Sequence, residues 1–199
     1  ADVLVVNSFE DLKAKAAQAK GKIVLFNLPF TEYRETVIVR TQGAIHAARA
    51  GAVASLIRSV GPFSMQTPHT GNMRYDDKVK RIPHAVLSVE DALMLARMQK
   101  RGETIRVRLK MEARTLPPAK SRNVISEIRG REKPNEIVIV SGHIDSWDGA
   151  TGTVDNGTGV ATTLEAARLL MKAGARPKRT IRFMLWSGEE QGLLGSKAW

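Results

Sequence analysis

Short apolar runs alternate with helical patterns along the first 115 residues. Runs of four or five apolar residues are typical of buried strands, whereas apolar residues spaced three or four apart are typical of helices. Ser8 and Ser88 each stand three residues before an acid, a capping pattern that opens a helix. The predicted strands are residues 23–26, 53–57, 85–87 and 105–111, and the predicted helices are residues 8–21, 36–49 and 88–101.

A break follows at residues 115–121, TLPPAKS, where two prolines and a lack of periodicity predict a domain boundary. Apolar runs then alternate with one helical pattern, which favours an α/β fold with a parallel or mixed sheet. These runs are residues 124–128, 137–141 and 181–186, and the helical pattern covers residues 158–173. We therefore expect two domains, residues 1–115 and 119–199.

Charged side chains follow two of these apolar runs. The first run leads to His143 and Asp145, with Asp155 twelve residues beyond the histidine, and the second leads to Glu189 and Glu190. Because ligands bind at the carboxyl ends of strands in open α/β sheets, we expect these side chains to share one site. One imidazole with several carboxylates suits zinc or a similar divalent ion. Of two adjacent glutamates, one could bind the metal and the other could act as a base.

The motifs His-x-Asp, Asp-Asn-Gly-x-Gly and Glu-Glu at these positions resemble those of the co-catalytic zinc exopeptidases. The resemblance extends to the segments SGHIDSWD, RPKRTIRF and LWSGEEQG, and upstream to RTQGA, ASLIRSV and PHTG. It implies that residues 1–115 form a protease-associated α/β domain. It also implies that residues 119–199 form the front part of a zinc-exopeptidase α/β/α sandwich with a mixed sheet.

The resemblance further implies a role for each candidate side chain. His143 would bind one zinc, Asp155 would bridge two zincs, Glu190 would bind the second, and Glu189 would be the general base. Asp145 would accept the second ring N–H of His143 and so fix the orientation of the ring. In the resembling enzymes, the peptide bond after the bridging aspartate is often cis, and we expect the same here.

The family pattern includes a later aspartate and a later histidine as metal ligands, but this sequence contains neither residue after Glu190. Each ion would then have two protein ligands, rather than the three usual in catalytic zinc sites. We therefore expect the chain by itself to bind metal poorly. The resemblance implies that the parent is a carboxypeptidase or dipeptidase of small peptides with two zincs per chain. It also implies a secreted or lysosomal homodimer.

Composition limits the other classes of function. The net charge is +11, yet no basic run exceeds two residues and only ten aromatic residues occur, which argues against nucleic-acid binding. No apolar run approaches the about 18 residues of a membrane span, and the first residues lack the shape of a signal peptide. We expect the chain to begin within a longer polypeptide or after processing. Two alternatives stay open: a non-catalytic binding module built on the protease-associated domain, and a polyanion-binding protein.

Overall fold

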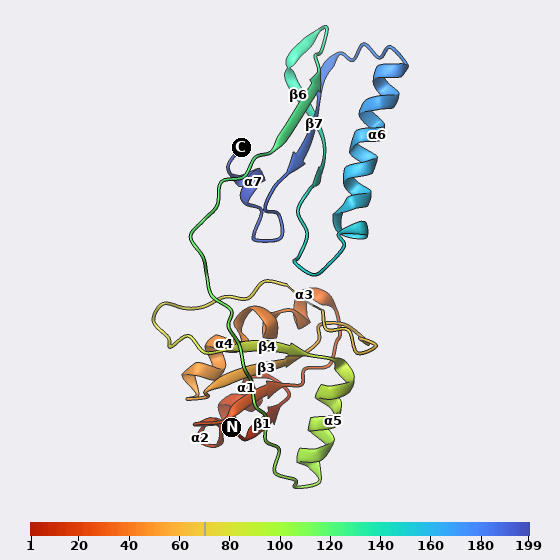
Figure 1. Ribbon diagram of the computed structural model, residues 1–199. Helices are drawn as coiled ribbons and strands as arrows, with labels where there is room; N and C mark the ends of the chain where they lie inside the picture. Colours follow the sequence, from red (N-terminus) through yellow and green to blue (C-terminus); the bar gives the residue numbers. More distant parts are fainter. Residues whose placement is uncertain (70) are drawn as a thin grey trace. The chain divides into compact units, whose positions relative to one another are not determined.

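The computed structural model describes residues 1–69 and 71–199, so that Thr70 of the PHTG motif lies outside the described residues. The chain forms two compact units, Ala1–Thr115 and Leu116–Trp199, each with its own sheet (Figure 1). One sheet is parallel and the other is mixed, which confirms the α/β class expected from the sequence.

The first unit is built on a four-stranded parallel sheet with the order β1-β2-β3-β4. The strands are β1 (Val3–Val6), β2 (Ile23–Phe26), β3 (Ala54–Arg58) and β4 (His84–Leu87). Every residue of β1 and β2 is buried, as expected for parallel strands that are covered on both faces. The helices are α1 (Phe9–Ala14), α2 (Ala16–Ala19), α3 (Tyr33–Thr36), α4 (Ile38–Arg49) and α5 (Val89–Lys100).

Two apolar clusters cover the two faces of this sheet. In one cluster, Leu12 of α1 and Ala47 of α4 belong to the same core as Phe26 of β2. In the other, Ala92 of α5 belongs to the same core as Leu56 of β3. Since side chains of a strand alternate between faces, the continuous apolar runs supply both cores at once.

The predicted starts of two helices, at Ser8 and Ser88, are confirmed by their caps. Ser8 accepts a hydrogen bond from the Asp11 N–H, and Ser88 accepts one from the Asp91 N–H, so each serine satisfies a free donor of the first turn. The helix predicted over residues 8–21 is divided into α1 and α2, because Lys15 leaves helical geometry with φ −103° and ψ 15°.

Two features of the first unit differ from the sequence prediction. β1 is not among the predicted elements, because a four-residue apolar run does not by itself distinguish a strand from a helix. The strand predicted over residues 105–111 is wrong: only an isolated antiparallel bridge between Asp2 and Arg106 forms there. The backbone hydrogen bonds around this bridge join residues 1–3 to residues 105–107. Within the described chain, residues 108–111 are therefore not part of a strand ladder.

The second unit contains a three-stranded sheet with the order β5-β7-β6. β5 (Val124–Ile128) runs antiparallel to the central strand β7 (Arg179–Trp186), and β6 (Lys133–His143) runs parallel to it. A π-helical segment, η1 (Thr153–Thr158), leads into α6 (Gly159–Lys172), which packs on β6 and β7 (Figure 1). A short helix, α7 (Leu194–Lys197), follows β7.

β6 begins at Lys133, four residues before the predicted start, with a shift in register between Lys133 and Ile137. The prediction rests on the apolar run that begins at Ile137, whereas pairing with β7 across the bulge extends the strand back through four residues of polar sequence and proline. The outer strands stay partly open: Val124 of β5 is 54% exposed and Val138 of β6 is 47% exposed. Across the part of the chain that the structure describes, no helix is long and apolar enough to cross a membrane.

Candidate metal centre

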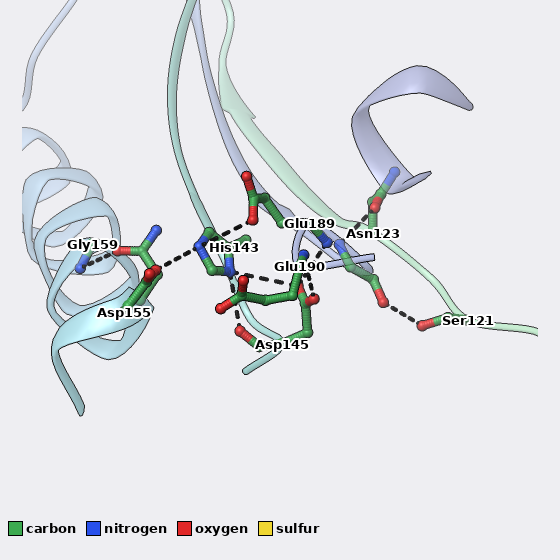
Figure 2. A network of polar contacts seen from close by, with 10 residues as sticks. Ser121, Asn123, His143, Asp145, Asp155, Gly159, Glu189 and Glu190 are labelled. Carbon is green, nitrogen blue, oxygen red and sulfur yellow. Dashed lines mark hydrogen bonds and ion pairs between the residues drawn. The ribbon is translucent and has the colours of Figure 1, made fainter. Parts of the chain in front are cut away.

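The carboxyl ends of β6 and β7 meet at one edge of the sheet in the second unit. The two strands are parallel, and His143 at the end of β6 lies opposite Trp186 at the end of β7. The segments that leave these strands therefore start side by side, one with Asp145 and the other with Glu189 and Glu190 (Figure 2). The sheet thus brings together side chains that are more than 40 residues apart in the sequence.

His143 and Asp155 are in direct contact, with 3.0 Å between Nε2 of the ring and Oδ1 of the carboxylate. This contact depends on a close approach of β6 to α6 at Gly142. A Cβ atom at Gly142 would lie 2.9 Å from the backbone carbonyl carbon of Gly159, so only glycine fits there. The peptide bond between Asp155 and Asn156 is cis, as the resemblance implied.

Asp145 does not make the hydrogen bond that the resemblance implied. The ring Nδ1 of His143 donates to the backbone carbonyl of Asp145 at 3.0 Å, and the nearer carboxylate oxygen lies farther away, at 3.5 Å. The carboxylate instead accepts the backbone N–H groups of Glu189 and Glu190, at 3.0 and 3.1 Å. Those two N–H groups point at the two carboxylate oxygens, which leaves the carbonyl as the closer acceptor for the ring. Asp145 therefore links the segment after β6 to the loop that carries the two glutamates.

Glu190 completes a group of potential metal ligands. One ligand atom each from His143, Asp155 and Glu190 lie within 4.8 Å of one another. The Glu189 carboxylate stands beside this group, with Oε2 3.9 Å from Nε2 of His143 (Figure 2). The indole N–H of Trp147 donates a hydrogen bond to the Glu190 side chain. The potential ligands thus come from β6, from η1 and from the loop after β7.

The groups of this centre shift one another's pKa. Burial disfavours the charged ring of His143, but the Asp145 carbonyl and the charges of Glu189, Asp145 and Asp155 outweigh burial and raise the pKa of His143. Burial and the charges of Asp155 and Glu189 raise the pKa of Glu190. Burial acts in the same direction on Asp145, yet the two backbone N–H bonds lower its pKa. The centre is therefore a region of excess negative charge, and a divalent cation would relieve it.

Asn123 is a residue of this region that the sequence did not identify. It precedes β5, and its side-chain amide bonds to the backbone of Ser187 and of Gly195, at the two ends of the glutamate loop. An asparagine before an apolar run has the local appearance of an ordinary loop residue. No motif or periodicity in the sequence marks it, because its partners lie more than 60 residues away.

Residues 123–199 match the model of a protein family described as Peptidase family M28. These residues include the whole candidate metal centre. One curated relative is the Carboxypeptidase Q of Pongo abelii, which is 51% identical over 98% of this chain and 42% of the relative. The chain thus spans less than half of the length of this relative.

Two solved structures are also similar. The crystal structure of a Peptidase M28 precursor from Shewanella amazonensis SB2B matches with a TM-score of 0.93 and 36% identity, over 100% of this chain and 46% of that chain. A zinc aminopeptidase from Bacillus subtilis matches with a TM-score of 0.60 and 27% identity, over 100% of this chain and 44% of that chain.

Proposed function

We propose that this chain is part of a dinuclear zinc exopeptidase, a carboxypeptidase or dipeptidase that hydrolyses small peptides. The observation that carries the proposal is the convergence of His143, Asp155 and Glu190 from three separate segments to within 4.8 Å. The names of the similar proteins, a carboxypeptidase and a zinc aminopeptidase, support the reaction class and the metal. Glu189, next to the three ligands, supplies the base that peptide hydrolysis needs.

The residues present fit zinc by their donor chemistry. One imidazole nitrogen and carboxylate oxygens are ordinary zinc ligands, and the ring of His143 is oriented by the hydrogen bond from Nδ1 to the Asp145 carbonyl. Nε2 then faces the carboxylates. The side chain of Asp155 is 76% exposed and its Oδ1 lies 3.0 Å from Nε2 of His143, so this carboxylate would be able to bind an ion together with the ring. A count of two zincs per chain is part of the proposal.

When bound, zinc lowers the pKa of water to about 7 and polarises a carbonyl group. In the proposed reaction, Glu189 takes the proton of the attacking water and passes it to the leaving amine. Its carboxylate is suited to this task because it is half-buried beside His143, and its backbone N–H is fixed by Asp145 at 3.0 Å. His143, Asp155 and Glu190 would hold the metal, and Asp145 keeps the loop of the two glutamates in place.

We also infer the wider organisation of the protein from the same resemblance. Residues 1–115 would be a protease-associated domain, and residues 119–199 the front part of the catalytic domain. The whole protein would be a secreted or lysosomal homodimer. Gel filtration and subcellular fractionation of the protein from its source would test these two statements.

Zinc titration of the purified chain against a chromophoric chelator tests the proposal. We expect measurable but weak binding, since each ion would have two ligands from these residues. Asp155→Asn should remove zinc binding. Glu189→Gln should leave zinc binding intact, and it should abolish dipeptide hydrolysis in a preparation whose wild-type protein is active. Glu165→Gln, on the exposed side of α6, is the matched control and should change neither property. Full hydrolysis by the Glu189→Gln variant would refute the assignment of the base.

A second candidate function is a non-catalytic binding module based on the first unit. It is favoured by a cavity of about 590 Å³ whose lining includes Phe30, Tyr33 and His69, bordered by the exposed side chains of Phe63 (70%) and Met65 (79%). Exposed apolar side chains next to a cavity are typical of interaction surfaces. A wild-type chain that takes up no zinc but binds an apolar peptide, with binding lost in Phe63→Ser, would favour this candidate over the peptidase.

A further inference from the structure

The two glutamates of the metal centre lie on a loop whose ends are held together. The Gly195 N–H donates to the Ser187 carbonyl at 2.8 Å, and the Leu194 N–H donates to the Gly188 carbonyl at 2.9 Å. The Glu189 carbonyl accepts the Leu193 N–H at 2.8 Å. The segment from Ser187 to Gly195 is therefore a closed loop, and the place where it closes determines where the glutamates point.

Asn123 bridges the closure point with both halves of its side-chain amide. Oδ1 accepts the Ser187 N–H at 3.1 Å, and Nδ2 donates to the Gly195 carbonyl at 2.8 Å. The site is tightly packed, since a Cβ atom at Gly195 would collide with Asn123 Oδ1 and with the Ser187 carbonyl. Only an amide offers one acceptor and one donor in this planar arrangement. A carboxylate of the same shape would place an acceptor against the Gly195 carbonyl.

The closed loop meets Asp145 on its other side. The N–H groups of Glu189 and Glu190 donate to the two oxygens of the Asp145 carboxylate at 3.0 and 3.1 Å. The loop is thus fixed at two places, by Asn123 at its ends and by Asp145 at the glutamates. These contacts set the backbone position of Glu189 and Glu190, and through it the direction of both carboxylates toward His143.

We propose that Asn123 is a positioning residue for the Glu189–Glu190 pair. It acts through the closure of the Ser187–Gly195 loop and touches neither metal nor substrate. The effect of Asn123 on metal binding rests on the proposed function. Its effect on the position of the Ser187–Gly195 loop does not. By this proposal, loss of the amide frees the N–H groups of the two glutamates without unfolding the sheet.

The test compares Asn123→Asp and Asn123→Ala with wild type and with Asn135→Asp, a control that makes the same charge change at an exposed position of β6. Amide hydrogen exchange is measured by NMR on the whole chain. The Glu189 and Glu190 amides should exchange about tenfold faster in both Asn123 variants, because hydrogen bonds that hold the loop are lost. Amides in the β5–β7 ladder, such as that of Phe183, should keep their wild-type rates.

Zinc titration provides the second readout. Loss of a residue that orients metal ligands typically weakens affinity about 10- to 100-fold, and we expect the lower end for Asn123→Asp. If the glutamate amides keep their rates, or if all amides of the second unit accelerate together, Asn123 is not a positioning residue. If wild type binds no zinc, the proposed function fails for this chain, and the exchange data still decide the role of Asn123.

Discussion

Acidification should destabilise the first unit through one buried histidine. His84, at the start of β4, is 9% exposed, and its Nε2–H donates to the Arg40 carbonyl at 3.1 Å. Its Nδ1 is buried and has no hydrogen-bond partner in the described part of the chain. The ring lies against Gly43 and close to Phe26 of β2, so that a Cβ at Gly43 would lie 3.1 Å from its Cε1. Burial, only partly offset by the bond to Arg40, lowers the pKa of His84 to about 4.

The folded state therefore favours the neutral ring, and the unfolded chain takes up the proton first as the pH falls. The stabilisation is complete above the ordinary histidine pKa of 6.5 and is lost as the pH falls from 6.5 to about 4. The difference between these two values corresponds to about 3 kcal/mol, and about 2 kcal/mol of it is lost between pH 7 and pH 5. This is a large share of the about 5–15 kcal/mol that stabilises an ordinary domain.

Urea unfolding at pH 7 and pH 5, followed through NMR cross-peaks of Leu25 and Leu56, measures the stability of the first unit. In His84→Gln, the side-chain amide can still donate to the Arg40 carbonyl, but it does not titrate. The loss of stability between the two pH values should therefore be smaller in this variant by about 2 kcal/mol. His46→Gln removes a less buried histidine and should keep most of the wild-type loss. If His84→Gln keeps the full loss, the assignment to His84 is wrong.

Two further predictions concern the loop before β4 and the start of α6. Glu90→Gln should speed the amide exchange of Met65 and Gln66, since the Glu90 carboxylate accepts both N–H groups. The pKa of Glu90 is lowered to about 2, chiefly by a hydrogen bond from its own backbone N–H and then by the Ser64 hydroxyl and the N–H groups of Gln66 and Met65. In wild type, the hydrogen bonds from Met65 and Gln66 to Glu90 should therefore hold above pH 4.5 and weaken as the pH falls toward about 2. Exchange that is equal in both proteins would contradict this. Gly142→Ala should force β6 away from Gly159, destabilise the second unit by about 1–3 kcal/mol and weaken zinc binding. Unchanged urea and zinc titrations would show that the close approach is dispensable.

The sequence predicts the elements of the fold where an apolar run has clear ends. The strand over residues 23–26 and the capped starts of α1 and α5 could be located because local chemistry decides them. Residues 105–111 show the limit of this reasoning, since their alternation is correct for a strand but a ladder also needs a partner along its whole length. β6 shows the same limit, because pairing with β7 extends it through a bulge to Lys133.

At the candidate metal centre, the residue types could be predicted, but their hydrogen-bond partners could not. His143 and the acids at the strand ends are visible as a motif, and the parallel register of β6 and β7 brings them together. The choice of Asp145 between the ring of His143 and the amides of Glu189 and Glu190 depends on the path of the loop after β7. That path depends in turn on contacts more than 60 residues apart, which no local pattern reveals.

Hydrogen bonding, and not residue type, distinguishes the carboxylates that could bind a metal from the one that supports the loop. Four acids surround His143, and such crowding is costly unless each charge is compensated. Both oxygens of Asp145 are bonded to backbone N–H groups, which lowers its pKa and leaves it unsuited to bind an ion. For Glu190, by contrast, burial and the charges of Asp155 and Glu189 raise the pKa. A cation would therefore relieve the charge of Glu190, which converges with Asp155 and His143 to within 4.8 Å.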